Sequence, residues 1–241
     1  MNAVVISQPM LFPWPGFFEQ MMLAERYYFL DDVQFSKGSF INRVQIKNFE
    51  KINWMTIPLS AKSGYQEIRN LITVDDGWRD KHIAILSQAF RHAPYKKDAI
   101  RLAEKAYAKE SIIDVLIESI EASASYLGIA TDQYRVRTSS INVSGHSSQR
   151  VLDIVIAATG SLYITGHGAA NYLDHEAFVY AGIEVDYMNY SRTPWPQSGG
   201  EFTPFVSILD LIANVGPRSA DHLKPATENW RTFILPRAKT D

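Results

Sequence analysis

The segment Thr-Gly-His-Gly-Ala-Ala-Asn at 165–171 has residue types that could hold an anion. The apolar run before it predicts a strand that ends at Thr165. Gly166 and Gly168 would then open a helix whose backbone N–H groups and dipole favour negative charge. His167 lies between the glycines and could exchange a proton near neutral pH. Neither GxGxxG nor GK[ST] is present, so a plain turn between strand and helix stays an alternative.

Asp31 and Asp32 end a second apolar run, which predicts a strand over 27–32. A carboxylate there could bind Mg2+ or act as a general acid or base, depending on its burial. Successive strand residues point to opposite faces, so at most one of the two carboxylates can face a given pocket. One functional carboxylate and a solvated turn both stay open, and a two-carboxylate metal site is disfavoured. We take Asp32 and His167 as the candidate proton acceptors.

The stretch 35–47 concentrates basic side chains shortly after the two acids. Arg43 and Lys47 share one face of a predicted strand because their spacing is even, and with Asn42 they could grip a phosphate or a carboxylate. Lys37 adds to the same patch. A solvated hairpin face is the alternative interpretation.

The loop QPMLFPWPGF at 8–17 follows the first predicted strand and is stiff and apolar, whereas a phosphate loop would be rich in glycine. As part of a binding site it would supply the amide of Gln8 and a stacking wall from Trp14. A rigid turn that fills the core is the alternative, because buried aromatic residues are common.

Composition narrows the classes of function. The six histidines include no HxxxH pair, so no metal-ligating residue is predicted. The formal net charge of -2 gives no global positive field that would indicate nucleic acid or an anionic membrane. Cysteine is absent, which excludes disulfides and thiolate catalysis. No apolar run is long enough to span a bilayer, so we expect a cytoplasmic protein without membrane insertion.

Strands alternate with helices in the first and last parts of the chain, which implies parallel crossover units. Short connections between 40 and 74 instead indicate antiparallel hairpins. We therefore predict one domain over 1–241 with a mostly parallel, Rossmann-like three-layer α/β sheet, of which the HUP class is one form, and an insertion of hairpins and helices at 40–128. Ligands bind such sheets beyond the carboxyl ends of the strands, where we place the segments 8–16, 31–32, 139–147, 165–171 and 189–200. The predicted strands cover 3–7, 27–32, 40–47, 52–59, 67–74, 134–139, 161–165 and 183–190. The predicted helices cover about 16–25, 75–90, 97–108, 111–128, 147–159, 170–180 and 205–214, before an irregular tail. Asp75 or Asp76 could cap the helix at 75–90, and Ser111 opens the helix at 111–128.

Five blocks of the chain, taken together, resemble a known family: VVISQPMLFPWPGFF, FLDDVQFSKGSFINRVQIK, SLYITGHGAANYLD, GIEVDYMNY and PQSGGEFTPFVSILDLIANVG. Their order and spacing are similar to those of the WbqC-like family of bacteria, along the whole chain except the helical region near 80–130. The resemblance implies a link to O-antigen and other surface-polysaccharide gene clusters. It also implies transfer of an amino acid such as glycine, the activity proposed for family members.

The resemblance extends to individual residues. The family pattern at the glycine loop is matched by Tyr163, Ile164, Thr165, Gly166, His167, Gly168, Tyr172, Leu173 and Asp174. The N-terminal pattern is matched by Gln8, Pro9, Pro13, Trp14, Gly16, Asp31, Asp32, Phe35, Asn42, Arg43 and Lys47. The C-terminal pattern is matched by Gln197, Phe202, Ser207, Asp210 and Gly216. Trp195 departs from the pattern, which usually has a tyrosine before the Pro-Gln pair, and this leaves the details of ligand binding open.

We expect a transferase that joins an activated amino acid or acyl group to an amine or hydroxyl of a sugar or nucleotide-linked acceptor. The sequence contains no Ser-His-Asp or Cys-His pattern that would form a covalent enzyme intermediate. We therefore expect direct transfer between two substrates that the protein holds in position. The alternatives are a HUP-like ligase or nucleotidyltransferase that uses ATP with Mg2+, transfer to a modified nucleic-acid base, and a non-catalytic nucleotide-sugar-binding module. The residues indicate no other cofactor and leave the oligomeric state open. The expected binding residues are Gln8, Trp14, Asp31, Asn42, Arg43, Lys47, Tyr163, Thr165, Gly166, Gly168, Tyr172, Gln197 and Phe202.

Overall fold

A six-stranded sheet forms the centre of the structure, in the strand order β5-β2-β1-β6-β7-β8. The computed structural model describes residues 2–60, 64–74, 76–130 and 135–234. All neighbouring strands pair in parallel except β8, which runs antiparallel to β7. The mostly parallel Rossmann-like sheet predicted from the sequence is therefore confirmed. The strands are β1 (Ala3–Ser7), β2 (Arg26–Phe29), β5 (Arg135–Arg137), β6 (Leu162–Thr165), β7 (Glu184–Met188) and β8 (Thr227–Asn229).

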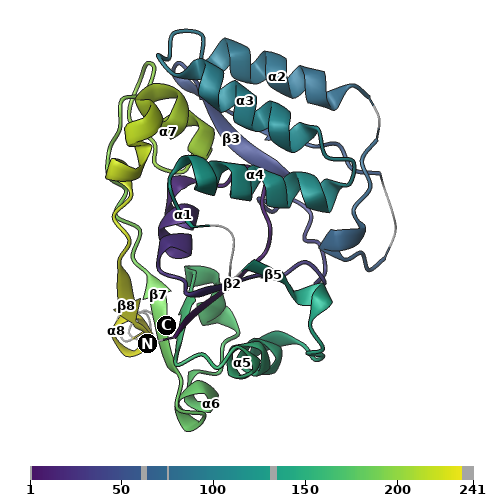
Figure 1. Cartoon of the computed structure of the whole chain (residues 1–241), viewed down its shortest axis with the longest axis vertical. Helices are drawn as coiled ribbons and strands as arrows, with labels where there is room; N and C mark the ends of the chain where they lie inside the picture. The colour runs from purple at the N-terminus through teal and green to yellow at the C-terminus, as the bar shows by residue number, and fades with distance from the viewer. Residues whose placement is uncertain (1, 61–63, 75, 131–134, 235–241) are drawn as a thin grey trace.

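Helices cover both faces of this sheet. Four successive residues of β1 are buried, as expected of a strand with both faces covered. On one side lie α1 (Pro15–Met22) and the helices of the insertion, and on the other lie α5 (Ser147–Ala157) and α6 (His175–Tyr180) (Figure 1). Pro15 occupies the first turn of α1, where its fixed φ suits the helix and its missing N–H costs no hydrogen bond.

The insertion contains a two-stranded antiparallel sheet, β3 (Arg43–Asn48) with β4 (Lys51–Thr56), and three helices. These are α2 (Trp78–Ala89), α3 (Lys96–Tyr107) and α4 (Ile112–Tyr126). The predicted cap at Ser111 is confirmed, because its side chain accepts a hydrogen bond from the backbone N–H of Asp114. Near the end of the chain, α7 (Ile208–Val215) packs against α3.

The prediction of a strand over 67–74 is wrong. A 3-10 turn, η1 (Ile68–Asn70), occupies this stretch, with isolated bridges at Glu67 and Thr73 on either side. The N–H groups of Ile68 and Arg69 bind the carbonyls of Val33 and Asp31, so the segment is tied to the loop after β2. The alternation of apolar and polar side chains along 67–74 does not indicate that these N–H groups bind the loop after β2.

The region after β6 also differs from the prediction. Residues His167–Asn171 form a 3-10 helix, η3, and α6 begins only at His175, with the Asp174 side chain as its cap. The glycines therefore do not lie at the N-terminus of an α-helix, and the helix dipole expected there is absent. The tail contains β8 and α8 (Trp230–Ile234) in place of the irregular chain that was predicted.

The remaining short elements are η2 (Thr138–Ser140) and η4 (Gly216–His222). Of the two predicted caps of the helix at 75–90, Asp75 lies outside the described residues, as does residue 134 of the predicted 134–139 strand. Asp76 does not cap α2, whose N-cap is Gly77.

The direction of strand succession reverses beside β1. From β1 the chain passes through α1 to β2 and then on to β5, whereas β6 and β7 lie on the opposite side of β1. Such a reversal point leaves a crevice at the carboxyl ends of the two strands that flank it, because the connections leave in opposite directions. Here those strands are β1 and β6.

Candidate functional site

A cavity of about 370 Å³ lies beyond the carboxyl ends of the central strands. Gln8 follows β1, Asp32 follows β2, and Tyr172 follows β6. The first turn of α5 and a residue of the insertion complete the wall. The cavity is lined by Gln8, Leu30, Asp32, Val33, Gln34, Tyr65, Gly145, His146, Ser147, Arg150, Val151, Ile154 and Tyr172. Three of the residues predicted from the sequence, Gln8, Asp32 and Tyr172, therefore meet at one site.

Asp32 forms an ion pair with Arg150 of α5. Nη2 of Arg150 donates to Oδ2 of Asp32 at 2.6 Å, and the Thr138 hydroxyl donates to Oδ1 at 2.6 Å. Both charged side chains are largely buried. Burial acts to raise the pKa of Asp32, but the hydrogen bonds from Arg150 and Thr138 outweigh it, and the pKa lies below its usual range. Asp32 is therefore an anion at neutral pH and a weak proton acceptor.

Asp31 has a different role, because its fully buried carboxylate ties β2 to the segment after β5. Arg137 binds Oδ2 at 2.7 Å, and the Ser139 hydroxyl binds the same oxygen at 2.8 Å. The backbone N–H of Ser139 donates to Oδ1 at 3.0 Å. Asp31 does not line the cavity, so of the two acids only Asp32 faces it. Both residues follow the end of β2 at Phe29, so the loop after the strand sets this division.

The turn that leads into α5 carries unusual backbone geometry. Gly145 has φ +110°, and Ser147, the first residue of α5, has φ +55°, a value that L-residues adopt only with strain. His146 lies between them at the N-cap, with an exposed side chain. His146 and the positive end of the α5 dipole therefore lie beside the cavity that Arg150 also lines.

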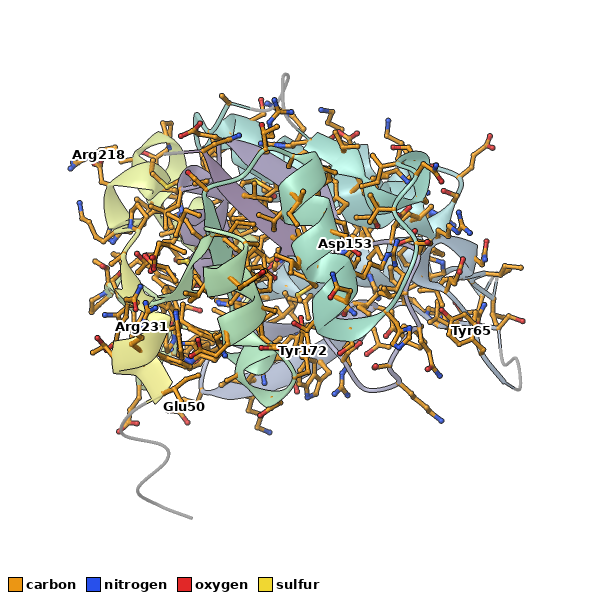
Figure 2. All side chains as sticks on the ribbon, turned by 90° about the horizontal axis from the view of Figure 1, so that it is seen from below. Glu50, Tyr65, Asp153, Tyr172, Arg218 and Arg231 are labelled. Atoms are coloured by element: carbon orange, nitrogen blue, oxygen red, sulfur yellow. The ribbon has the colours of Figure 1, made fainter. Side chains whose placement is uncertain are left out.

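Two tyrosines line the cavity from different parts of the chain. The exposed fraction is 67% for Tyr65 and 46% for Tyr172. In Figure 2, Tyr65 lies on the outer flank of the molecule and Tyr172 nearer the centre of the face shown. Partial burial raises the pKa of the Tyr172 hydroxyl, so this side chain is a neutral hydrogen-bond donor at physiological pH.

The glycine loop adjoins this cavity through Tyr172 but does not itself line it. Gly166 and Gly168 both have ordinary negative φ, and a Cβ atom added at either would meet no atom within 4 Å. Neither backbone conformation nor packing therefore requires glycine at these positions, and the surface above them is open. Nε2 of His167 lies 2.7 Å from the carbonyl oxygen of Met188, and its ring packs on Phe233. The structure thus separates His167 from Asp32.

Tyr163 and Thr165, also predicted to bind substrate, belong to the interior. Tyr163 is buried, stacks on Phe178 at 5.5 Å between ring centroids, and has a pKa raised by burial. Thr165 is 4% exposed. Both residues belong to β6, and they lie near the glycine loop only because that loop follows the end of this strand.

The predicted basic patch is not a single surface. Nε of Arg43 donates to the carbonyl of Ser39 at 3.3 Å, and the guanidinium lies 4.1 Å from the centroid of the Trp54 ring. Asn42 is buried and donates to the carbonyl of Ile57 at 2.9 Å. Lys37 is exposed and lies in the loop before them.

Lys47 points away from solvent and joins β3 to the C-terminal block. Its Nζ donates to Oε1 of Gln197 at 3.2 Å and to the carbonyl of Glu201 at 2.6 Å. Phe202 packs edge-on against Trp195, whose Nε1 donates to Asp210 at 2.7 Å. The structure thus brings together the predicted residues Lys47, Gln197 and Phe202, but away from the cavity.

Trp14, the predicted stacking wall, is half-buried at the start of α1. Its ring contacts Phe17 and Phe40, and it lies against Gly16, where a Cβ would come within 2.9 Å of the indole nitrogen. It does not line the cavity. The observed packing of the loop 8–17 agrees with the alternative interpretation given above, a rigid turn whose aromatic residues pack against one another.

Neither a metal-binding cluster nor a membrane-spanning helix is found in the described residues. They contain no group of three or more His, Cys, Asp or Glu side chains placed to hold a metal ion. Within the same parts of the chain, no helix is both long and apolar enough to cross a membrane.

Comparison with known proteins gives the lineage of the chain. The family model described as WbqC-like protein family matches residues 8–222. The chain belongs to the WbqC-like family. A relative is the uncharacterized protein Rv1507c of Mycobacterium tuberculosis (strain ATCC 25618 / H37Rv), which is 28% identical over 230 residues, covering 93% of this chain and 98% of that protein. No solved structure matches the chain.

The WbqC-like match contains every residue that lines the cavity, from Gln8 to Tyr172. It ends before β8 and α8, so the strand and helix that complete the far edge of the sheet lie outside it. The cavity thus lies within the part of the chain that the family model matches, whereas β8 and α8 lie outside it.

Sequence reasoning missed several residues of the cavity in this WbqC-like protein, namely Tyr65, His146, Ser147 and Arg150. One signal was available. The loop 139–147 follows a predicted strand and was expected at the carboxyl edge of the sheet, so its histidine was a reasonable candidate. Arg150 and Tyr65 carried no such signal, because the first lies within a helix and the second in a polar loop.

Proposed function

We propose that this WbqC-like protein is a transferase that acts in surface-polysaccharide biosynthesis. It joins an activated amino acid, such as glycine, or another acyl group to an amine or hydroxyl of a sugar or nucleotide-linked acceptor. The observation that carries the proposal is the convergence of Gln8, Asp32, His146 and Arg150 on one cavity at the reversal point of the sheet. A concave site with a few convergent polar groups is the usual form of a small-molecule site.

In this proposal Arg150 and the N-terminus of α5 hold an anionic part of the donor or acceptor. Guanidinium groups bind carboxylates and phosphates strongly, and a helix N-terminus favours the same charge. Asp32 fixes the position of Arg150 through the 2.6 Å contact. Asp32 is thus a positioning residue, since its low pKa makes it a poor proton acceptor.

His146 takes the role of proton acceptor that the sequence suggested for His167. His146 lines the cavity, whereas the imidazole of His167 contacts the Met188 carbonyl elsewhere. The acceptor's nitrogen or oxygen attacks the acyl carbon, a new amide or ester bond forms, and the bond to the leaving group breaks. The attacking atom gives its proton to His146, and the leaving group departs with the electron pair. The amide of Gln8 can hydrogen-bond the acyl oxygen.

A HUP-like, ATP-dependent activity is the second candidate. It is favoured by the strand order, because nucleotides bind open α/β sheets at the point of strand reversal. Arg150 and the first turn of α5 are the residues here that would hold phosphates. Asp32 is the carboxylate of the cavity that could take part in binding Mg2+, and ATP would supply the activation of the acyl group.

The test combines a ligand screen with transfer assays. Purified protein is heated with ATP and Mg2+, nucleotide sugars or aminoacyl donors, and ligands that raise the melting temperature are assayed for transfer by mass spectrometry. We expect His146→Ala to lower kcat by about a hundredfold or more, as for loss of a general base. His92→Ala, which removes an exposed histidine outside the cavity, is the matched control. Equal rates in both variants would exclude the role of His146.

A further inference from the structure

Strand β4 has an open hydrogen-bonding edge. The N–H of Ile57 donates to the carbonyl of Asn42, which continues the ladder with β3 and shows that the odd-numbered residues of β4 face β3. The backbone groups of Ile52, Trp54 and Thr56 therefore point away from β3, because the two directions alternate in an antiparallel pair. His82 lies 3.0 Å from the carbonyl of Thr56, as this geometry requires.

The outer edge of β3 is covered at Gln45, whereas that of β4 is open at Ile52 and Trp54. On β3 the outward carbonyl of Gln45 accepts a hydrogen bond from the N–H of Ser207. Within residues 2–60, 64–74, 76–130 and 135–234, the outward N–H and carbonyl groups of Ile52 and Trp54 have no protein partner. Two successive outward-facing residues of β4 thus offer unused donors and acceptors.

The side chains along this edge are apolar and exposed. The exposed fraction is 47% for Ile52 and 42% for Trp54, and Phe40, which packs against Trp54 at 5.3 Å, is 37% exposed. Proteins usually protect such an edge with proline, a bulge or inward-pointing charge, because an unpaired apolar strand attracts another strand. Residues 51–56 contain no proline, and β4 pairs with β3 without a bulge along its length.

We propose that the outer edge of β4 pairs antiparallel with β4 of a second copy of this chain. The two-fold axis passes beside Asn53, and the two hairpins form one continuous four-stranded sheet. Only residues that both point outward can exchange hydrogen bonds, so even-numbered residues of β4 must pair with each other. Of these registers we choose the one in which the two residues with unused backbone groups pair, Ile52 with Trp54 of the second copy and the reverse, since the Thr56 carbonyl is already bound by His82.

The side chains of this register are complementary across the axis. Each Ile52 lies opposite a Trp54, which gives an aromatic–β-branched pair of the kind that stabilises antiparallel sheets. Each Lys51 lies opposite a Met55, so no two like charges face each other. Self-complementarity of this kind is what a two-fold dimer interface requires, and it favours a second copy over an unrelated peptide.

A single introduced cysteine tests the pairing directly, because the chain contains none of its own. Asn53 would face Asn53 of the second copy as a non-hydrogen-bonded pair, with Cα atoms about 4.5 Å apart, within reach of a disulfide. We expect wild-type protein to sediment as a dimer and Asn53→Cys to form a covalent dimer under mild oxidation. Tyr180→Cys is the control, because that side chain is 97% exposed and lies on α6.

A second variant separates loss of pairing from loss of folding. Ile52→Lys places an exposed charge at the apolar edge, and we expect a monomer whose circular dichroism and melting temperature match those of a wild-type sample diluted to monomer. A wild-type protein that sediments only as a monomer would overturn the proposal. So would equal oxidation rates for Asn53→Cys and Tyr180→Cys, or an Ile52→Lys variant that stays dimeric.

Discussion

Nη2 of Arg150 lies 2.6 Å from Oδ2 of Asp32, across 118 positions of the chain, and this contact fastens the first turn of α5 to the end of β2. The side chains of Arg150 and Asp32 are 10% and 15% exposed, so each charge is stabilised mainly by the other rather than by water. The contact also makes one wall of the cavity, which joins the stability of the fold to the geometry of the proposed site.

Asp32→Asn is expected to destabilise the protein by about 3 kcal/mol, because it leaves the buried guanidinium of Arg150 without its counter-charge. Urea unfolding followed by tryptophan fluorescence measures this change. Asp221→Asn is the control, since it breaks an exposed pair with Arg218 and should alter the free energy of unfolding by less than about 0.5 kcal/mol. Similar losses in both variants would contradict the coupling of Asp32 to Arg150.

His82 is expected to make the protein less stable in mild acid. Burial lowers its pKa to about 4. Nε2 must donate to the Thr56 carbonyl, so neutral Nδ1 accepts from the Tyr107 hydroxyl. A histidine with a folded-state pKa below the unfolded value of about 6.5 contributes stability that is complete above that value and is lost as pH falls toward 4.

The expected loss between pH 6.5 and 4 is about 3 kcal/mol. Thermal unfolding across this range measures it. His82→Gln keeps a donor for the Thr56 carbonyl but cannot be protonated, so its stability should change less over the same interval. Parallel curves for the two proteins would show that His82 does not titrate as expected.

Asp210 is expected to make the protein less stable as pH rises, which is the reverse of the effect expected of His82. Burial raises the pKa of its carboxyl to about 6, against the lowering effect of hydrogen bonds that include the one from Trp195. An acid whose folded-state pKa is raised contributes stability that is present below the unfolded pKa and is lost as pH rises through 6. Asp210→Asn should therefore be more stable than wild type at pH 8, by on the order of 2 kcal/mol. Guanidinium unfolding at pH 5 and pH 8 compares the two proteins.

Gly166→Ala is expected to fold normally, because the added Cβ meets no atom within 4 Å and φ is negative. Its free energy of unfolding should be unchanged or higher by up to about 1 kcal/mol, since alanine restricts the unfolded chain. Gly160→Ala is the contrast. There a Cβ would come within 2.7 Å of Val4 and Val155, and overpacking should cost about 1–3 kcal/mol. A destabilised Gly166→Ala would show that the surface above the loop is not open.

Ligand assays on the same pair test the loop's role. If Gly166 faces a bound anion, Gly166→Ala should weaken donor or acceptor binding while leaving stability intact. Unchanged KM values for both substrates would show that the glycine loop does not bind them. The proposed site would then be limited to the cavity around Arg150.

Local patterns were sufficient for most of the elements. The apolar run at 3–7, the proline at the start of α1 and the serine before α4 each express a short-range preference of the backbone, and each prediction agrees with the structure. The parallel sheet followed from the alternation of such elements. The stretch 67–74 was assigned wrongly as one strand, because the N–H groups of Ile68 and Arg69 bind the carbonyls of Val33 and Asp31, and only residues 72–74 bond to the preceding segment 58–60.

The contacts among polar side chains at the cavity and around Lys47 depend on packing between segments that are distant in the sequence. The sequence placed Gln8, Asp32 and the loop 139–147 at one edge of the sheet, because parallel strands bring their carboxyl ends together. It could not show that Lys47 points into the protein toward Gln197, or that Arg150 reaches Asp32. Strand alternation gives the face on which a side chain lies, but the partner on that face is set by how helices and loops pack over it. For this WbqC-like protein, short-range preferences thus determine the sheet and the edge at which the cavity lies, and long-range packing determines which residues share the cavity.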